Sequence, residues 1–203
     1  MAPHPATPEN SKRRLLWVPI VHSPEDLGSL SSAVRRASQK KTGRRGWKKK
    51  VETIGQIWKQ IERSLENRSL PWTRVRLYQD GLPICGREQE IVKELADAGS
   101  PNHRILLKLV KRGAKLMGTE SPDLLLEEYE LSKRVLEGAE LEDKEHLSRE
   151  AALLLERRDR FIAKRIDDTL ASGETGVIFL GMLHSLEPWL DRDLKPERID
   201  VHP

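Results

Sequence analysis

Four consecutive apolar residues stand between two glycines near the C-terminus of the chain, in the run Gly176-Val-Ile-Phe-Leu-Gly181. A run this short and this apolar is typical of a strand that is buried on both faces of a sheet. Such sheets are mostly parallel, because the helices that connect parallel strands cover both sides. This segment is therefore the clearest strand in the sequence.

The rest of the chain alternates between strand-like and helix-like patterns. Strands are predicted at residues 15–21, 74–80 and 114–118, with an edge strand at 199–201. Apolar residues at helical spacing begin at Val51 and recur at 87–95, at 105–110, after Ser121 and in the segment that ends at Gly173. The alternation predicts one α/β domain over residues 12–203, with a mainly parallel central sheet flanked by helices.

Composition excludes several classes of protein. Hydrophobic residues make up 37% of the chain and charged residues 33%, and no apolar run reaches the roughly 18 residues of a membrane helix. Cys85 is the single cysteine, which excludes an internal disulfide and a cysteine-based zinc site. The first residues are polar and proline-rich, so we expect residues 1–11 to be a disordered tail. They lack the apolar core of a secretory signal, and a cytoplasmic location is expected.

Polar side chains follow the predicted strands at the points where the strands end. They are His22, Ser23, Asp80, Thr119, Glu120, His184 and Ser185. In open parallel sheets, ligands bind beyond the carboxyl ends of the strands. The sequence therefore predicts that these groups meet at one edge of the sheet.

Two of these strand ends have similar sequence motifs, Pro19-Ile-Val-His22-Ser23 and Gly181-Met-Leu-His184-Ser185. Two imidazoles and a carboxylate such as Glu120 suit zinc, manganese or iron, and a bound metal would lower the pKa of a water ligand. Without a metal, the same residues suit acid–base hydrolysis with Glu120 or Asp80 as the base. The structural alternative is that each histidine only forms hydrogen bonds at the end of its strand.

The serines of these two motifs are weaker candidates for a catalytic role. Neighbouring residues on an extended chain point to opposite faces, so neither serine can pair with the histidine beside it. A Ser–His pair would have to form between the two motifs, for example between Ser185 and His22. Ser23 and Ser185 are therefore predicted to bind a ligand rather than to act as nucleophiles.

The C-terminal part of the chain resembles a known motif. Its residues are Glu156-Arg-Arg158-Asp159-Arg-Phe-Ile162-Ala163, followed by a helix and by Gly176-Val-Ile-Phe-Leu-Gly-Met-Leu-His184. This pattern resembles the closing motif of the TraB family, which is grouped with ChaN-like proteins, erythromycin-esterase-like proteins and Tiki metalloproteases. Proteins of this family have an earlier Gly-x-x-His motif near the N-terminus. Pro19-Ile-Val-His22 is similar to that motif, with proline in place of glycine.

The resemblance implies a pocket at which the two histidines meet and toward which Arg158 is directed. Members of the group have been linked to metal-dependent peptide cleavage, to esterase chemistry and to haem binding. We therefore expect a TraB-like hydrolase in which Arg158 holds an anionic or carbonyl-bearing substrate. The expected catalytic residues, which are also the candidate ligands of a divalent metal ion, are His22, Glu120 and His184. The expected ligand-binding residues are Arg158, Asp80, Ser23 and Ser185.

The alternative from a different class is a non-catalytic module that senses a small anionic ligand in the same pocket. A metal-dependent enzyme needs both imidazoles and a carboxylate within bonding distance of one point, about 2.0–2.2 Å, whereas a sensor needs them only to line a cavity. In the functional interpretation, the side chain of His184 faces a solvent-accessible pocket and contributes little to the core.

The distribution of charge sets one segment apart. Residues 1–50 hold 12 Lys/Arg and 3 acidic residues, whereas the remaining residues hold 24 Lys/Arg and 29 acidic residues. The excess is concentrated at residues 35–50, RRASQKKTGRRGWKKK, which are predicted to form a mobile basic loop. Three roles remain open for this segment: a solvated loop, a membrane-surface contact, or binding of nucleic acid or another phosphate-bearing ligand, with Trp47 stacking on a base.

Overall fold

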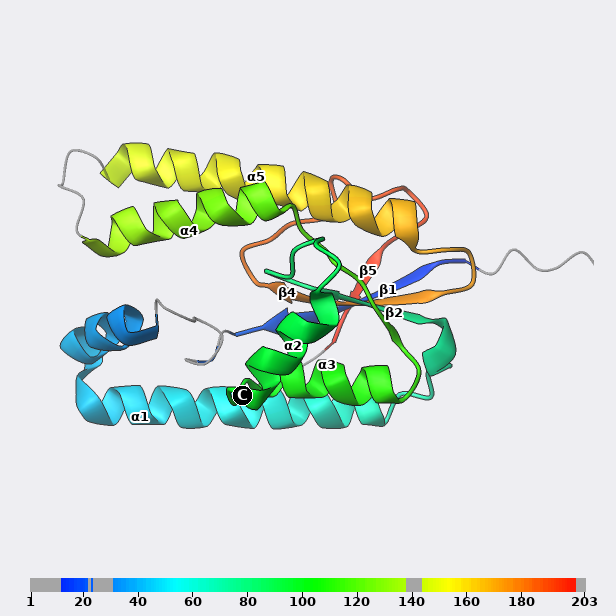
Figure 1. Cartoon of the computed structure of the whole chain (residues 1–203), viewed down its shortest axis with the longest axis horizontal. Coiled ribbons are helices and arrows are strands. Elements are labelled where there is room, and N and C mark those ends of the chain that lie inside the picture. The colour runs from blue at the N-terminus through cyan, green and yellow to red at the C-terminus, as the bar shows by residue number, and fades with distance from the viewer. Residues whose placement is uncertain (1–11, 22, 24–30, 138–143, 200–203) are drawn as a thin grey trace, which may run out of the picture.

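A computed structural model describes residues 12–21, 23, 31–137 and 144–199 of the chain. Five parallel strands form one sheet in the order β3-β2-β4-β1-β5. Helices cover both faces of this sheet (Figure 1). The predicted α/β class with a parallel central sheet is confirmed. The predicted tail at residues 1–11 lies outside the described residues.

The strands are β1 (Arg14–Ile20), β2 (Val75–Gln79), β3 (Lys115–Leu116), β4 (Thr175–Gly181) and β5 (Pro196–Arg198). β4 lies in the centre, where it pairs with β1 over seven residues and with β2 over five. Residues 175–180 of β4 are all buried, as its run of consecutive apolar side chains requires. The edge strand β5 ends just before the predicted residues 199–201, and it begins at a proline, which an edge strand tolerates.

The helices are α1 (Ser31–Glu66), α2 (Glu88–Asp97), α3 (Pro101–Lys111), α4 (Pro122–Glu137) and α5 (Lys144–Thr169), with a 3-10 turn η2 at Trp72–Arg74. The start of α3 follows the predicted pattern. Pro101 lies in its first turn, and the side chain of Ser100 accepts a hydrogen bond from the N–H of His103. In the described ranges, no helix combines the length and the apolar character needed to cross a membrane.

Alternate residues of the strands pack on opposite faces of the sheet. Leu16 and Phe179 belong to the core under α1, α2 and α3. Leu15 and Ile178 belong to a second core, under α5. Helices α4 and α5 form a hairpin that extends past the end of the sheet (Figure 1), and buried leucines such as Leu154 hold its two arms together.

The basic segment at residues 35–50 is helical, so the prediction of a loop there is wrong. Lysine, arginine and glutamine are good helix formers, and this propensity outweighs the lack of apolar residues to bury. The segment also continues directly into the part of α1 that packs on the core, beginning at Ile54. Gly43 interrupts the helix with φ 73° and ψ 173°, so α1 consists of two helical pieces that meet at this glycine.

Candidate functional site

The carboxyl ends of β2 and β4 lie side by side, and the chain leaves them in opposite directions. After β2 the chain continues toward β3, whereas after β4 it crosses β1 to reach β5 on the other side of the sheet. A reversal of this kind opens a crevice beyond the strand ends, which is the usual ligand site of open α/β sheets. Asp80 follows β2 and Gly181 closes β4, so both residues stand at this reversal.

Arg158 of α5 is the centre of a cluster of buried charges at these strand ends. Its Nε donates to Oε2 of Glu120 at 2.7 Å, and one terminal nitrogen donates to Oε1 of the same carboxylate at 2.8 Å. That terminal nitrogen also donates to Oδ1 of Asp80 at 2.8 Å, and the other one donates to Glu128 of α4. The planar fork of arginine suits such two-point binding of carboxylates. All three guanidinium nitrogens of Arg158 are therefore bound to carboxylates.

His184 lies at the other end of the same cluster. Its Nδ1 is 2.5 Å from Oδ1 of Asp159, and its Nε2 is 3.5 Å from Oδ2 of Asp80. The backbone N–H of Ser185 donates to the second oxygen of Asp159 at 3.0 Å. The side chains of His184, Asp159 and Asp80 are each less than one tenth exposed. The prediction of a solvent-facing His184 is therefore wrong, because its ring is enclosed between two carboxylates.

The carboxylates change the protonation of this histidine. Burial lowers the pKa of the His184 imidazole, but the hydrogen bonds to Asp159 and Asp80 more than offset burial and raise that pKa from 6.5 to about 9. The ring is therefore protonated at neutral pH and can donate from both nitrogens. Burial also raises the pKa of Glu120, although Arg158 and a backbone N–H act in the opposite direction.

Two glycines bring backbone N–H groups to the carboxylates. Gly81 donates to Oε1 of Glu120 at 2.7 Å, and its φ of 74° lies in the left-handed region that favours glycine. Gly181 donates to Oδ2 of Asp80 at 3.0 Å. A Cβ atom at Gly181 would lie only 3.0 Å from that oxygen, so a side chain there would crowd the contact.

A cavity of about 490 Å³ borders this charge network. It lies between the α4–α5 hairpin, the loop after β4 and the first turn of α1, and its lining is mainly apolar. The lining residues that matter here are Leu131, Ser132, Val135, Leu155, Leu183, Glu128 and Arg158. The Glu128–Arg158 ion pair is the point at which the cavity and the charge network meet.

Four of the predicted site residues come together in the network: Asp80, Glu120, Arg158 and His184. Ser185 joins it through its backbone N–H, but its side chain is exposed. Ser23 is buried. His22 lies outside the described residues, so its predicted meeting with His184 stays a prediction.

Sequence reasoning missed two members of the network, Asp159 and Glu128. Asp159 was part of the Arg-Asp pair in the TraB-like motif, which was the signal that could have placed it at the site. Glu128 lies on α4 between Leu124 and Leu131, which are both buried. Glu128 is four residues after Leu124 and three residues before Leu131, and this spacing places all three side chains on one face of a helix. The spacing was the signal in the sequence that could have identified Glu128.

The arrangement does not fit a divalent metal held by Glu120 and His184. Both oxygens of Glu120 accept N–H groups from Arg158 or Gly81, and both ring nitrogens of His184 face carboxylates. A guanidinium group also lies against Glu120, where a metal ion would add a second cation. Among the residues that the structure describes, no group of three or more His, Cys, Asp or Glu side chains could hold a metal ion.

Three residues of the TraB-like motif, Arg158, Asp159 and His184, are members of this one network. Comparison of the chain with models of protein families, with curated proteins and with solved structures found no match. The likeness to the TraB family therefore stays a proposal. The geometry and charge of the site are the main guides to its function.

Proposed function

We propose that this chain is a binding module for a small ligand with an apolar body and a cationic head. The observation that supports this most directly is the mainly apolar cavity of about 490 Å³ that meets a buried charge network at the Glu128–Arg158 pair. The volume falls in the range of small-molecule sites, and apolar pockets with a few polar groups are typical of them. The charge network also stands at the carboxyl ends of the strands, where this class of fold binds ligands.

The charge of the network favours a cationic head over an anionic one. The network contains four carboxyl groups, those of Asp80, Glu120, Glu128 and Asp159, against one guanidinium and one imidazolium. Arg158 already binds three of these carboxylates, so its guanidinium has little capacity left to bind an anionic ligand. The side chain of Glu128 is 44% exposed, so an ammonium group in the cavity can reach its carboxylate. This proposal differs from the sequence-based expectation of an anionic ligand held by Arg158.

Three probes with one chain length and different heads test the proposal: decylamine, decanol and decanoate. Calorimetric titration below the micelle concentration should show decylamine binding at least tenfold more tightly than the other two, a difference of about 1.4 kcal/mol. Glu128→Gln should remove this preference while leaving decanol binding unchanged. Equal affinities for all three heads, or a preference that persists in Glu128→Gln, would contradict the proposal.

The location of the probe is tested by filling the cavity. Ala152 lines the cavity and is exposed, so Ala152→Trp should block decylamine without disturbing the core. The matched control is Ala98→Trp, at an exposed alanine that follows α2 and does not line the cavity. The control should bind as the wild type does. Unchanged binding by Ala152→Trp would place the ligand elsewhere.

Hydrolysis by acid–base chemistry is a second candidate, favoured by the hydrogen bond between His184 and Asp159. A carboxylate on Nδ1 orients the ring, as in many hydrolytic sites, and Nε2, which lies 3.5 Å from Oδ2 of Asp80, would transfer its proton to a substrate group that displaces this carboxylate. Because the pKa of His184 is raised to about 9, the ring would serve as a general acid at neutral pH rather than as a base. The resemblance to the TraB group, which includes esterase-like proteins, also supports this candidate.

Hydrolysis of p-nitrophenyl acetate and p-nitrophenyl decanoate separates the two candidates. An enzyme should hydrolyse at least one ester faster than buffer, and His184→Gln should lower that rate at least tenfold. The control Ser148→Ala, at an exposed serine of α5 that does not line the cavity, should leave the rate unchanged. A binding module should give the same rate in all three proteins. The metal content of the purified protein, measured by mass spectrometry before and after dialysis against a chelator, tests the metal-dependent form of this candidate.

A further inference from the structure

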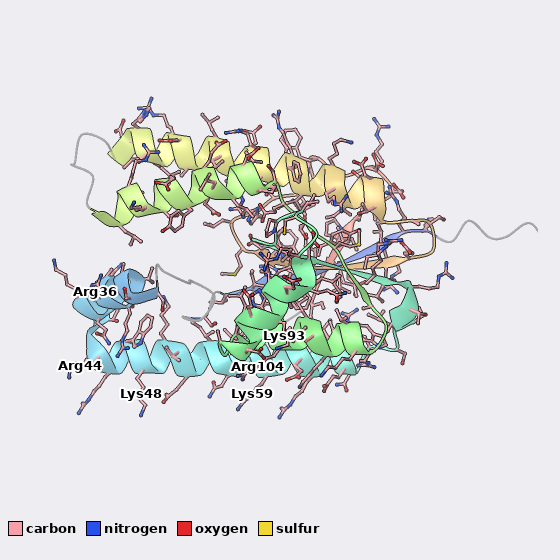
Figure 2. All side chains as sticks on the ribbon, in the orientation of Figure 1. Arg36, Arg44, Lys48, Lys59, Lys93 and Arg104 are labelled. Carbon is pink, nitrogen blue, oxygen red and sulfur yellow. The ribbon has the colours of Figure 1, made fainter. Side chains whose placement is uncertain are left out.

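The first half of α1 holds the strongest concentration of positive charge in the chain. Residues 35–50 contain nine Lys/Arg and no acidic residue, and all nine side chains are exposed. Within the described residues, Lys48 alone of the nine has a carboxylate within ion-pair distance, that of Glu52 at 3.9 Å. Arg44 and Lys48 lie along the outer side of α1 in Figure 2, where their side chains point away from the sheet. The proposed ligand cavity uses none of these nine cations.

This part of α1 reaches past α2 and α3 (Figure 1). The first buried residue of α1 is Ile54, so residues 44–53 form a projecting helical segment of about 15 Å. Its outer end is at Gly43, where the two pieces of α1 meet. The first piece of α1 folds back beside this segment on the side toward the sheet (Figure 1), so a partner can approach the segment from its outer side and its flanks.

The five cations of this segment are spread around the helix. At about 100° per residue, Arg44, Arg45, Lys48, Lys49 and Lys50 cover about two-thirds of the circumference. Trp47 and Val51, which are partly buried, occupy the remaining sector. A partner with negative charge on two opposite walls could contact cations on both sides of the helix. A flat negative surface could contact the cations on only one side.

We propose that residues 44–50 bind double-stranded DNA by inserting the projecting helix between the phosphate-lined walls of the major groove. A helix with side chains is about 10–12 Å across and the major groove of B-form DNA is about 12 Å wide. Lysine and arginine at these positions contact phosphates on either side, which gives affinity without reading sequence. The narrow major groove of A-form RNA excludes such a helix.

An anionic membrane is the competing polyanion, and the pattern of side chains disfavours it. A helix that lies on a membrane has its cations on one face and a wide apolar face opposite. In residues 44–50, Trp47 is the only large apolar side chain. The segment therefore has too little apolar surface to insert between lipid headgroups.

Fluorescence anisotropy with a labelled DNA duplex of about 20 bp tests the proposal on the full chain. Four to five phosphate contacts predict that the logarithm of the binding constant falls with the logarithm of the salt concentration with a slope of about −4. Between about 50 and 200 mM salt, affinity should therefore fall about 250-fold. Single-stranded DNA and an RNA duplex of the same length should bind more weakly than the DNA duplex.

Two variants with the same change in net charge locate the contact. The first replaces Arg44, Arg45, Lys48 and Lys49 with glutamine, and it should lose most of the salt dependence and at least tenfold in affinity at low salt. The matched control replaces four exposed cations of the α4–α5 hairpin with glutamine: Lys133, Arg149, Arg157 and Lys164. The control should bind DNA within threefold of the wild type.

Several results would overturn the proposal. Equal losses in the two variants would show that net charge, and not this segment, attracts DNA. Single-stranded DNA or duplex RNA that binds as tightly as duplex DNA would rule out insertion into the major groove. Binding to phosphatidylserine-containing vesicles without binding to DNA would identify a membrane surface as the partner. Circular dichroism of each variant should show an intact fold, because the substituted side chains are exposed.

Discussion

Nδ1 of His184 lies 2.5 Å from Oδ1 of Asp159, although 25 positions separate the two residues in the chain. Asp159 is part of α5 and His184 follows β4, so this hydrogen bond ties a helix to the carboxyl edge of the sheet. On the other side of the imidazole, Asp80 connects the same edge to the end of β2. The charges of this network therefore join three segments that lie apart in the sequence, so removing one of these charges should change the stability of the protein.

The stability that His184 provides is expected to fall between pH 6.5 and pH 9. Its pKa is about 9 in the folded protein, against 6.5 for an unperturbed histidine. Because the folded state binds the proton more tightly, the contribution is complete below pH 6.5 and is lost as the pH rises through 9. The measurement is the difference in urea-unfolding free energy between wild type and His184→Gln. This difference should shrink by on the order of 3 kcal/mol across that range. A constant difference would show that the ring is not held as an imidazolium.

Arg158→Ala is expected to destabilise the protein by about 3–5 kcal/mol, because it leaves buried carboxylates without their partner. The neighbouring Arg157 provides a matched control, since its side chain is 55% exposed and pairs with the exposed Glu127. Arg157→Ala should cost less than about 1 kcal/mol. Denaturant unfolding of both variants checks this, and similar losses for the two would contradict the structural role of the buried network.

Gly181→Ala is expected to destabilise the protein by about 1–3 kcal/mol, as overpacking does elsewhere. The added Cβ would lie 3.0 Å from Oδ2 of Asp80 and would push this carboxylate away from the backbone N–H. The control is Gly55→Ala in α1, where nothing lies within 4 Å of the position that an added Cβ would take. That change should stabilise the helix by up to about 1 kcal/mol. Thermal melts of the two variants should therefore shift in opposite directions.

Phe179→Ala is expected to cost about 3–5 kcal/mol, because it opens a cavity in the core between β4 and the helices. Phe179 is completely buried, whereas Leu183, four residues later, is 85% exposed. Leu183→Ala should therefore change the free energy of unfolding by less than about 0.5 kcal/mol. Comparable losses for the two variants would mean that the strand β4 ends later than Gly181 or packs differently.

The local pattern of the sequence was enough to predict most elements of the fold. The apolar run in Gly176–Gly181 predicted the central strand β4, and the alternation of patterns predicted a parallel sheet with helices on both faces. The segment at residues 35–50 was mispredicted because its charge was weighed above the helix propensity of lysine and arginine. Periodicity within a segment reflects which of its faces is buried, so it can be detected without knowing the neighbours of that segment.

The sequence by itself also indicated that Asp80, Glu120 and His184 stand at the carboxyl edge of the sheet, since strand ends can be identified one at a time. Only the tertiary structure decided which of these groups bind one another. It placed β4 between β1 and β2, packed α5 against this edge, and so gave His184 the carboxylates of Asp159 and Asp80. The order of strands and the packing of helices depend on contacts between residues far apart in the chain, and no local pattern encodes those contacts. The protonation of His184 follows from these contacts, because a pKa is set by the charges and the burial around a group in space.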